Sequence, residues 1–473
     1  MDDDDLCFLD AVELARMVRE REVSAREVVG AQLGRVERVN PVVNAIVTLD
    51  GEGALAAAGR ADERLARGEA VGPLHGLPVA FKDVHLTRGM RTTLGSPVFA
   101  EHVPDEDELV VRRMQDAGAV RVGKTNVPEF GAGSHTFNPV FGATRNPYDL
   151  GRSAGGSSGG AAAALAAGLQ PLADGSDMGG SLRNPASFCN VVGLRPTPGR
   201  VPAYPTLNVR DALTVPGPMG RTVADVALLL SVMAGPDPRC PLSLETPAAD
   251  SFRAPLARDT RGLRVAWAPD LGGRVPVDPD VRDVLDRQGA VFEGLGWRVE
   301  EDCPDLDGAD FVFRTLRAQA FVLGLGAVLD EFPGQVKATV AWNIAEGRRL
   351  TGGDIARATA EHTRILLAAS AFFERYDVLL APVSQVAPFD VDLEYPRVVD
   401  GRPQETYIDW MRSCSWLSLL GAPALSVPAG FTAAGLPVGV QIVGPPRAER
   451  AVLEAGAAFE GATGWGRRRP TAV

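Results

Sequence analysis

Short apolar runs alternate along the chain with longer stretches of mixed apolar and charged residues. The runs have the length of buried strands and lie at 77–81, 120–122, 263–267, 377–381, 424–427 and 438–443. The mixed stretches predict two helices within 10–39, the second with a capping box at Ser24, and further helices at 51–68, 106–117, 278–294 and over most of 309–374. This alternation predicts one large α/β sheet covered by helices on both faces.

Residues 131–199 interrupt this pattern. They are rich in Gly, Ser, Asn and Pro, with one Ala-rich helix predicted at about 160–168. Composition alone would make the segment a linker. We expect it to be folded instead, because its small residues are clustered in motifs and flanked by core-like runs. Residues 236–260 are Pro-rich and are predicted to cross the surface.

Composition is that of an ordinary globular protein. Of 473 residues, 45% are hydrophobic and 23% are charged, and no apolar run approaches the roughly 20 residues of a membrane span. The net charge of −12 without a basic tract predicts no nucleic-acid or membrane partner. The acidic N-terminus has the wrong charge for a targeting peptide. Five cysteines without a CxxC pair predict neither a disulfide framework nor a zinc knuckle, so we expect a cytoplasmic protein.

Lysine is rare in this chain. Of the 48 basic residues only Lys82, Lys124 and Lys337 are lysines, and lysine, unlike arginine, can lose its proton when buried. Lys82 directly follows the apolar run 77–81, where desolvation should lower the pKa of its ammonium group. Lys82 is therefore a candidate general base. The alternative is a surface lysine paired with Asp83 or another carboxylate.

Two glycine-rich segments carry serines. Gly155-Gly-Ser-Ser-Gly-Gly160 holds two serines where glycines allow close backbone approach, although a flexible turn would look the same. In the segment 174–185, consecutive glycines before Ser181 can direct several backbone N–H groups into one space, which would form an oxyanion site. The alternative for this segment is a tight turn with Arg183 paired to Asp177.

Two other motifs match known patterns without the right context. Residues 118–125 fit the phosphate-loop pattern, but that loop must follow a strand and open a helix, whereas here a helix is predicted before it and Pro128 blocks one after it. Residues 155–159 fit the nucleophile elbow, whose serine needs a later histidine. Only His362 follows, in a charged helical stretch, so a Ser-His-Asp esterase is a weaker alternative. No histidines have metal-ligand spacing, and no metal site is predicted.

Lys82, the two serine-bearing segments and several other motifs, taken in their order along the chain, resemble the amidase signature family. The resemblance rests on Val79-Ala-Phe-Lys-Asp83, 123–130, 141–147, the two serine-bearing segments, 189–196, 421–428 and 435–444. It extends from about residue 8 to 465, is strongest over 71–200 and is weakest over 236–375. Several motifs in one order are much more specific than any one of them.

The resemblance implies a single α/β domain over 1–473 with a mixed central β-sheet and helices on both faces. Within it we expect N-terminal helices in 1–70, the signature core in 71–200, a variable and mostly helical region in 236–375, and a return to the sheet in 376–473. If the protein forms an oligomer, we expect a homodimer, because dimers are the commonest oligomers.

The resemblance also implies a Ser-Ser-Lys triad that works without cofactor or metal. Ser157 would be the nucleophile, Ser181 the bridging serine and Lys82 the base, so that Lys82 takes a proton from Ser181 and Ser181 takes one from Ser157. The oxyanion hole would consist of four backbone N–H groups, with three supporting residues; the donors are Met178, Gly179, Gly180 and Ser181, and the supports are Ser158, Asp177 and Arg183. The family more often has Ile or Thr at Met178, which we expect to change only the shape of the pocket.

The predicted activity is hydrolysis of a small-molecule carboxylic amide to an acid and ammonia or an amine, with esters and carbamates as further substrates. Phe130, Gly131 and Ala132 resemble the family's pocket wall, and Trp410 and Trp416 are candidates for an apolar wall, with core packing as their alternative. The other candidate function is the glutaminase (A-type) subunit of a tRNA-dependent transamidase. Such subunits usually carry an acidic group in the region of Asp409, but the neighbouring tryptophans argue against a glutamine site.

Overall fold

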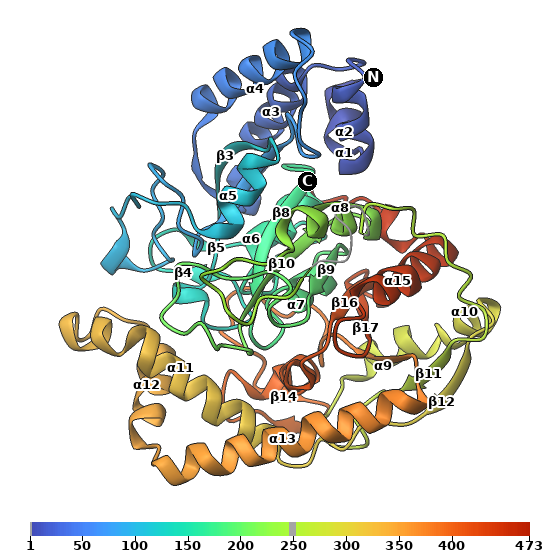
Figure 1. Ribbon diagram of the computed structural model, residues 1–473. Coiled ribbons are helices and arrows are strands. Elements are labelled where there is room, and N and C mark those ends of the chain that lie inside the picture. The colour runs from blue at the N-terminus through green and yellow to red at the C-terminus, as the bar shows by residue number, and fades with distance from the viewer. Residues whose placement is uncertain (1, 246–251) are drawn as a thin grey trace.

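The computed structural model describes residues 2–245 and 252–473. Residue 1 and part of the surface crossing predicted at 236–260 lie outside the described residues. The N-terminal helices form a lobe beside the main body (Figure 1) and are α1 (Asp3–Phe8), α2 (Ala11–Arg19), α3 (Ala25–Val43) and α4 (Gly51–Ala66). The predicted capping box is present: the Glu27 N–H donates to Ser24 Oγ at 3.1 Å, and the Ser24 N–H donates to Glu27 Oε2 at 2.8 Å.

The central sheet has eight strands in the order β12-β11-β13-β17-β16-β9-β10-β8. β11 runs parallel to β12 and β13, and the other neighbouring pairs are antiparallel. The sheet is therefore mixed, as the resemblance implied. Its strands are β8 (Leu172–Asp177), β9 (Val192–Arg195), β10 (Val215–Gly220), β11 (Arg264–Trp267), β12 (Arg298–Glu301), β13 (Val378–Pro382), β16 (Ala424–Phe431) and β17 (Pro437–Val443).

Helices cover both faces of this sheet. On one face Leu425 and Val427 of β16 pack at Gly456 of α15, and on the other Gly439 of β17 lies against Ser187 of α7. Alternate residues thus face opposite helices, as expected for strands buried on both sides. The helices near the sheet are α6 (Gly159–Ala166), α7 (Arg183–Phe188), α8 (Val223–Met233), α9 (Pro279–Asp286), α10 (Gly289–Gly294), α14 (Arg412–Ser415) and α15 (Glu449–Thr463).

The prediction of one sheet is wrong for the N-terminal strands. β1 (Ile46–Leu49), β3 (Val120–Thr125) and β2 (Pro78–Lys82) form a separate sheet in the order β1-β3-β2. β2 lies beside β8, but side chains take the place of ladder hydrogen bonds: the Ala80 N–H donates to Gln170 Oε1 at 2.8 Å and the Lys82 N–H donates to Asp174 Oδ1 at 3.1 Å. The two sheets therefore meet without merging.

The segment rich in small residues is core and not linker, as predicted. Every residue of α6 is buried, and a Cβ on Gly160 would lie 2.3 Å from the backbone nitrogen of Asn126. Small residues are needed here because backbone packs directly on backbone. Short strands precede this helix: β4 (Phe137–Asn138), β5 (Gly142–Ala143), β6 (Arg145–Asn146) and β7 (Asp149–Ser153).

The variable region is mostly helical, as predicted. Its long helices are α11 (Ala309–Glu331), α12 (Ala338–Arg349) and α13 (Gly352–Arg375), and α11 packs against both of the others (Figure 1). Among the described helices α11 alone has the length and apolar composition of a membrane span. Core helices share these properties, and α11 carries Arg314 and Arg317.

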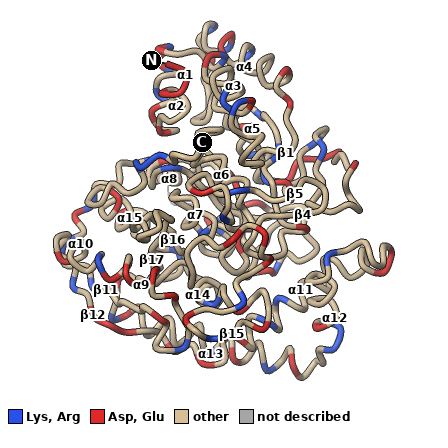
Figure 2. The backbone as a smooth tube through the Cα atoms, turned by 180° about the vertical axis from the view of Figure 1, so that it is seen from behind, with Lys and Arg blue, Asp and Glu red and all other residues tan. Residues whose placement is uncertain are grey.

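The remaining elements are short or peripheral. They are α5 (Leu109–Asp116), which precedes β3, and the hairpin of β14 (Val398–Val399) with β15 (Arg402–Pro403). Seen from behind, Lys and Arg are interspersed with Asp and Glu along the described chain (Figure 2).

Candidate active site

Lys82 ends strand β2 with its side chain fully buried. Its Nζ donates to Ser157 Oγ at 2.8 Å and to Ser176 Oγ at 3.0 Å. Burial lowers the pKa of Lys82 to about 7, against the opposing attraction of three nearby carboxylates. A large share of Lys82 is therefore neutral near pH 7 and able to accept a proton, which agrees with the desolvation expected from the sequence.

Ser157 lies in the tight loop between β7 and α6. The Gly156–Ser157 peptide bond is cis, and a Cβ on Gly156 would lie 2.9 Å from the backbone nitrogen of His135. The N–H of the buried Ser158 donates to the Ser181 carbonyl oxygen at 3.2 Å. This bond joins the loop of Ser157 to the turn that carries Ser181.

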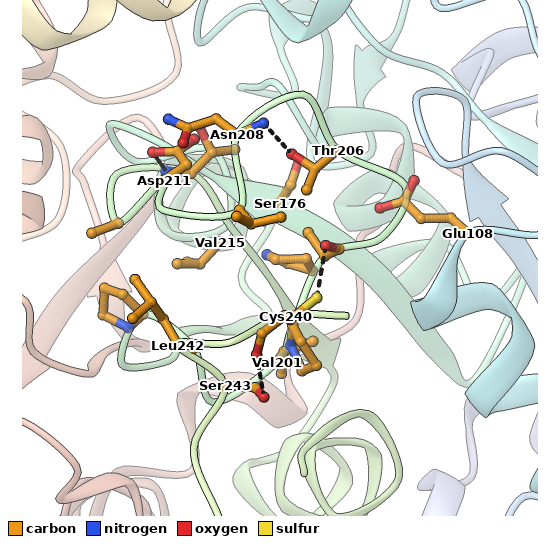
Figure 3. Close-up of a pocket in the computed structure, with 18 of the residues that line it drawn as sticks. Glu108, Ser176, Val201, Thr206, Asn208, Asp211, Val215, Cys240, Leu242 and Ser243 are labelled. Carbon is orange, nitrogen blue, oxygen red and sulfur yellow. Dashed lines mark hydrogen bonds between the residues drawn. The ribbon is translucent and has the colours of Figure 1, made fainter. Parts of the chain in front are cut away.

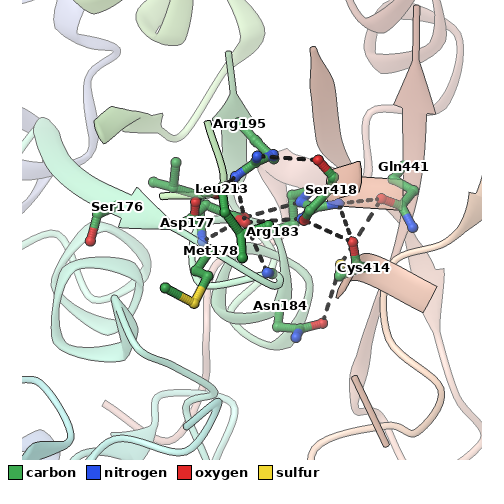
Figure 4. Close-up of polar contacts among 12 residues, drawn as sticks. Ser176, Asp177, Met178, Arg183, Asn184, Arg195, Leu213, Cys414, Ser418 and Gln441 are labelled. Atoms are coloured by element: carbon green, nitrogen blue, oxygen red, sulfur yellow. Dashed lines mark hydrogen bonds and ion pairs between the residues drawn. The ribbon is translucent and has the colours of Figure 1, made fainter. Parts of the chain in front are cut away.

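Asp177 shapes the turn before Ser181. Its carboxylate accepts from the N–H groups of Gly180 and Leu182 at 2.8 and 3.1 Å, and from Arg183 Nη2 and Nε at 2.9 and 3.0 Å (Figure 4). Burial alone would raise the pKa of Asp177, but the Arg183 guanidinium and these hydrogen bonds hold that pKa well below its usual range. The ionised carboxylate therefore fixes the turn.

The same network reaches the C-terminal part of the chain. Arg183 donates to Gln441 Oε1 at 3.0 Å and to Ser418 Oγ at 2.7 Å, and Arg195 donates to the Leu213 carbonyl oxygen at 2.9 Å (Figure 4). Arg183 thus joins the turn to β17 and to the segment before β16. The supporting role predicted for Arg183 has this structural basis.

The turn after Asp177 presents free backbone donors. The N–H groups of Met178, Gly179 and Ser181 have no acceptor within the described residues. The Gly180 N–H donates to the Asp177 carboxylate, so of the four donors predicted for the oxyanion hole it is already paired among the described residues. A Cβ on Gly179 would lie 2.7 Å from the Phe313 ring, so this close turn requires glycine. Unpaired backbone N–H groups at the wall of a cavity can bind an anion.

A cavity of about 190 Å³ opens onto these groups. Its polar wall contains Ser157, Ser176 and Ser181, and its other walls are mainly apolar, with Phe130, Gly131, Met178, Phe321 and Met411 among them. Phe130 and Gly131, which were predicted for the pocket wall, line this cavity, and their contact with substrate stays a prediction.

Ala132 and Trp410, also predicted for the pocket wall, do not line this cavity, and their contact with substrate stays a prediction. Trp410 is 1% exposed, and its ring packs against those of Phe188 and Phe389 with centroids 6.2 and 5.2 Å apart. Ala132 is buried in a small cluster that includes Phe321. Trp416 is buried in the same core as Trp410, so core packing accounts for both tryptophans.

A second cavity, of about 510 Å³, adjoins the first. Val84, Ser176 and Thr214 line both cavities. Glu108 lies on one side of the second cavity and Asp211 on the opposite side (Figure 3). Ser176, which contacts Lys82, therefore lies where the two cavities meet.

The predicted order of the serines differs from the geometry. We expected Ser181 to stand between Lys82 and Ser157, but Lys82 Nζ bonds Ser157 directly, and none of its hydrogen bonds within the described residues goes to Ser181. Ser157 is 2% exposed, while Ser181 is only partly buried at the cavity wall. The serine next to the base is thus the more enclosed of the two.

The phosphate-loop and nucleophile-elbow matches do not contribute their usual chemistry to this site. Lys124, in the phosphate-loop match, lies within β3 and donates to the His85 carbonyl oxygen at 2.6 Å. His362 lies on α13 with its Nε2 2.9 Å from the Leu419 carbonyl oxygen, and it does not line the cavity of the serines. Neither geometry supports nucleotide binding or a Ser-His-Asp triad.

Sequence reasoning missed several cavity residues. Ser176 precedes Asp177 in a segment already singled out, and its position two residues after Asp174 on a strand could have placed both on one face. Arg317 and Phe321 come from the region 236–375, where the resemblance is weakest, and nothing in their local sequence marks them. Met411 directly follows Trp410, which was predicted for the pocket in its place. Only the packing of α11 and of the segment before α14 brings them to the serines.

Comparison with known proteins gives matches over nearly the whole chain. The family model described as Amidase matches residues 27–453. An acylamidase of Rhodococcus erythropolis is 39% identical, covering 99% of this chain and 98% of its own. The A-type subunit of the glutamyl-tRNA(Gln) amidotransferase of Acidothermus cellulolyticus is also 39% identical, covering 97% and 95%. Among solved structures, a bacterial aryl acylamidase has a TM-score of 0.90 at 30% identity and covers 97% of each chain.

Proposed function

Since the chain belongs to the amidase signature family of hydrolases that act on amide C–N bonds, we propose that it is a stand-alone amidase for small carboxylic amides. It cleaves the amide through an acyl-enzyme to give an acid and ammonia or an amine. The observation that carries the proposal is the 2.8 Å hydrogen bond between Lys82 Nζ and Ser157 Oγ, beside a cavity lined by Ser181.

In the proposed mechanism Ser181 is the nucleophile and Ser157 is the relay. Neutral Lys82 accepts the hydroxyl proton of Ser157, and Ser157 accepts that of Ser181. The Ser181 oxygen then forms a bond to the substrate carbonyl carbon. The proton returns through Ser157 to the leaving nitrogen as the C–N bond breaks. Water repeats the sequence on the acyl-enzyme and releases the acid.

The oxyanion of the tetrahedral intermediate is held by backbone N–H groups. Met178, Gly179 and Ser181 supply the unpaired donors, and removal of one such donor typically costs about 3 kcal/mol of transition-state stabilisation. The turn is fixed before substrate binds because Asp177 holds the Gly180 and Leu182 N–H groups. Little reorganisation is then needed as charge develops.

A covalent probe tests the order of the serines. We expect a fluorophosphonate to modify Ser181, because that oxygen is the activated and accessible one, and peptide mass spectrometry locates the adduct. Lys82→Ala should lose labelling, whereas Ser231→Ala, on helix α8, should label as the wild type does. An adduct on Ser157 would restore the order first expected, and labelling of Lys82→Ala at the wild-type rate would remove Lys82 as the base.

The glutaminase subunit is the other candidate, and one observation disfavours it. Asp409 is 3% exposed, and its carboxylate is bonded to Arg314 and to Arg412. The cavity wall in this segment is formed by Met411. A free carboxylate for the ammonium group of glutamine is thus not supplied by Asp409.

Substrate preference separates these two functions. We expect the purified chain to release amine from simple acyl anilides and to leave glutamine intact, because none of the described residues that line the cavity is a carboxylate able to bind the ammonium group of glutamine. Product analysis by liquid chromatography with both substrates at equal concentration gives the comparison, with Ser181→Ala as the blank. Glutamine turnover that equals or exceeds anilide turnover would favour the transamidase component.

A further inference from the structure

Arg317 differs from the other buried arginines of the described chain. Four of them contact carboxylates: Arg35 with Asp4, Arg183 and Arg195 with Asp177, and Arg200 with Glu449. A fifth, Arg221, donates to three backbone carbonyl groups. Arg317 is 5% exposed and has neither kind of partner among the described residues.

The contacts of Arg317 leave much of its hydrogen-bonding capacity unused. Its Nη2 donates to Tyr407 Oη at 2.8 Å, its Nη1 contacts Met178 Sδ at 3.0 Å, and its buried Nε has no partner within the described residues. A thioether is a weak acceptor, whereas a guanidinium group carries five N–H donors. The guanidinium also lies over the Phe321 ring, 4.4 Å from its centroid, a contact that favours a cation without accepting a hydrogen bond.

Arg317 faces the cavity of the catalytic serines. It lines that cavity together with Ser157, Ser181 and Phe321. Arg314, three residues earlier on the same helix, is instead paired with Asp310 and Asp409. On this helix the Arg314 guanidinium is neutralised and does not line the cavity, whereas the Arg317 guanidinium lines the cavity and has no carboxylate partner among the described residues.

A buried cation without a counter-ion destabilises a fold unless another molecule completes its environment. A carboxylate is the group whose planar pair of oxygens best matches guanidinium donors. On the basis of the function proposed above, we propose that Arg317 determines specificity by binding a carboxylate carried by the amide substrate away from its scissile bond. The apolar walls then contact the part of the substrate between the carboxylate and the amide.

Matched substrates test this assignment on the wild-type enzyme. One pair is the mono-anilide of adipic acid and its isostere with an isopropyl group in place of the carboxylate. The second pair places the carboxylate on the amine portion, as N-acetyl-para-aminobenzoate against para-isopropylacetanilide. We expect kcat/KM to favour the carboxylate in one pair by about 10- to 100-fold, the range for a hydrogen bond to a charged group. The pair that responds identifies which portion of the substrate reaches Arg317.

Arg317→Met should remove that preference. We expect its kcat/KM to fall about 10- to 100-fold for the carboxylate substrate and less than about threefold for the neutral isostere. Arg317→Lys should restore part of the difference. Arg348→Met is the matched control, because Arg348 lies on the adjoining helix α12 in an exposed pair with Asp330. Thermal melting verifies that each variant is folded.

The outcomes separate the two proposals. If wild type hydrolyses neither member of either pair, the proposed amidase function fails. If wild type hydrolyses the neutral substrates without preferring a carboxylate in either pair, the amidase function stands and the role of Arg317 is refuted. Equal losses for both members of a pair in Arg317→Met also refute it. Should Arg317→Met not fold, the wild-type preference and Arg317→Lys still decide the question.

Discussion

The three lysines of the chain have different surroundings. Lys82 contacts the hydroxyl of Ser157, Lys124 donates to the His85 carbonyl oxygen, and the Lys337 Nζ lies 3.1 Å from Glu394. Lys82 and Lys124 are fully buried. Arginine supplies most of the other cations of the chain. Replacing lysine by arginine at Lys82 would add a permanently charged group, which could not act as a base.

The proposed role of Lys82 as the base predicts how activity depends on pH. The ammonium form cannot accept a proton, so kcat/KM for a neutral anilide should rise with pH and reach half its plateau near pH 7, where burial places the pKa of Lys82. Steady-state rates from pH 5 to 9 measure this dependence. Only pH values at which the melting temperature of the protein stays constant are used.

The variant Asp174→Asn tests independently in which direction the half-maximal pH moves when a carboxylate near Lys82 is neutralised. The Asp174 carboxylate favours the charged form of Lys82, so its neutralisation should move the half-maximal pH below that of the wild type. A profile that is flat across neutral pH, or a midpoint that moves upward in this variant, would contradict the assignment of Lys82 as base.

At the scale of elements, close packing between helices supplies one wall of the cavity. α11 carries Arg317 and Phe321 to that wall, and α12 packs along α11. The approach is close at Gly347, where a Cβ would lie 2.3 Å from the Ala318 carbonyl oxygen. By contrast, a Cβ on Gly324 of α11 would meet nothing within 4 Å. Gly347 therefore has no space for a side chain, whereas Gly324 has space for one.

The two glycines form a matched pair for mutation. Gly324→Ala should raise the free energy of unfolding by up to about 1 kcal/mol, because alanine is the better helix former. Gly347→Ala should lower it by about 1–3 kcal/mol through overpacking, and should raise KM as α11 shifts. Urea denaturation and steady-state kinetics measure both effects. Equal stabilisation by the two substitutions would show that the helices do not pack as closely as described.

At the scale of the whole molecule, one buried ionic network joins distant parts of the chain. Asp177 binds Arg183 and Arg195, and Arg183 in turn reaches Ser418 and Gln441 (Figure 4). The signature core and the C-terminal strands are therefore held together next to the oxyanion turn. We expect both stability and activity to depend on this network.

Neutralising Asp177 should damage both properties. Asp177→Asn leaves two buried guanidinium groups without their carboxylate, and we expect the free energy of unfolding to fall by about 3–5 kcal/mol together with the loss of most activity. Asp307→Asn is the control, since its pair with Arg274 is exposed and should change stability by less than about 1 kcal/mol. Chemical denaturation compares the two. Similar small losses in both variants would show that Asp177 does not hold the network.

Patterns local in sequence pointed to Lys82 and to the two glycine-rich segments that carry Ser157 and Ser181, and the structure places Ser157 beside Lys82 and both serines at one cavity. These residues lie in short motifs whose glycines and apolar flanks are consequences of close backbone approach, as at Gly156 and Gly179. The separate N-terminal sheet was not predicted, because a buried apolar run does not specify which strand it pairs with. The cytoplasmic location, the homodimer and the expected absence of macromolecular partners stay predictions.

The sequence by itself indicated Lys82 as a candidate base, because a lysine at the end of a buried apolar strand is desolvated and its pKa falls. Only the tertiary structure decided their order and their surroundings. It placed Ser157 next to Lys82, committed the Gly180 N–H to Asp177, buried Trp410 in the core and brought Arg317 to the cavity. Each of these depends on contacts between segments far apart in the chain, and local patterns do not encode the distances between such segments.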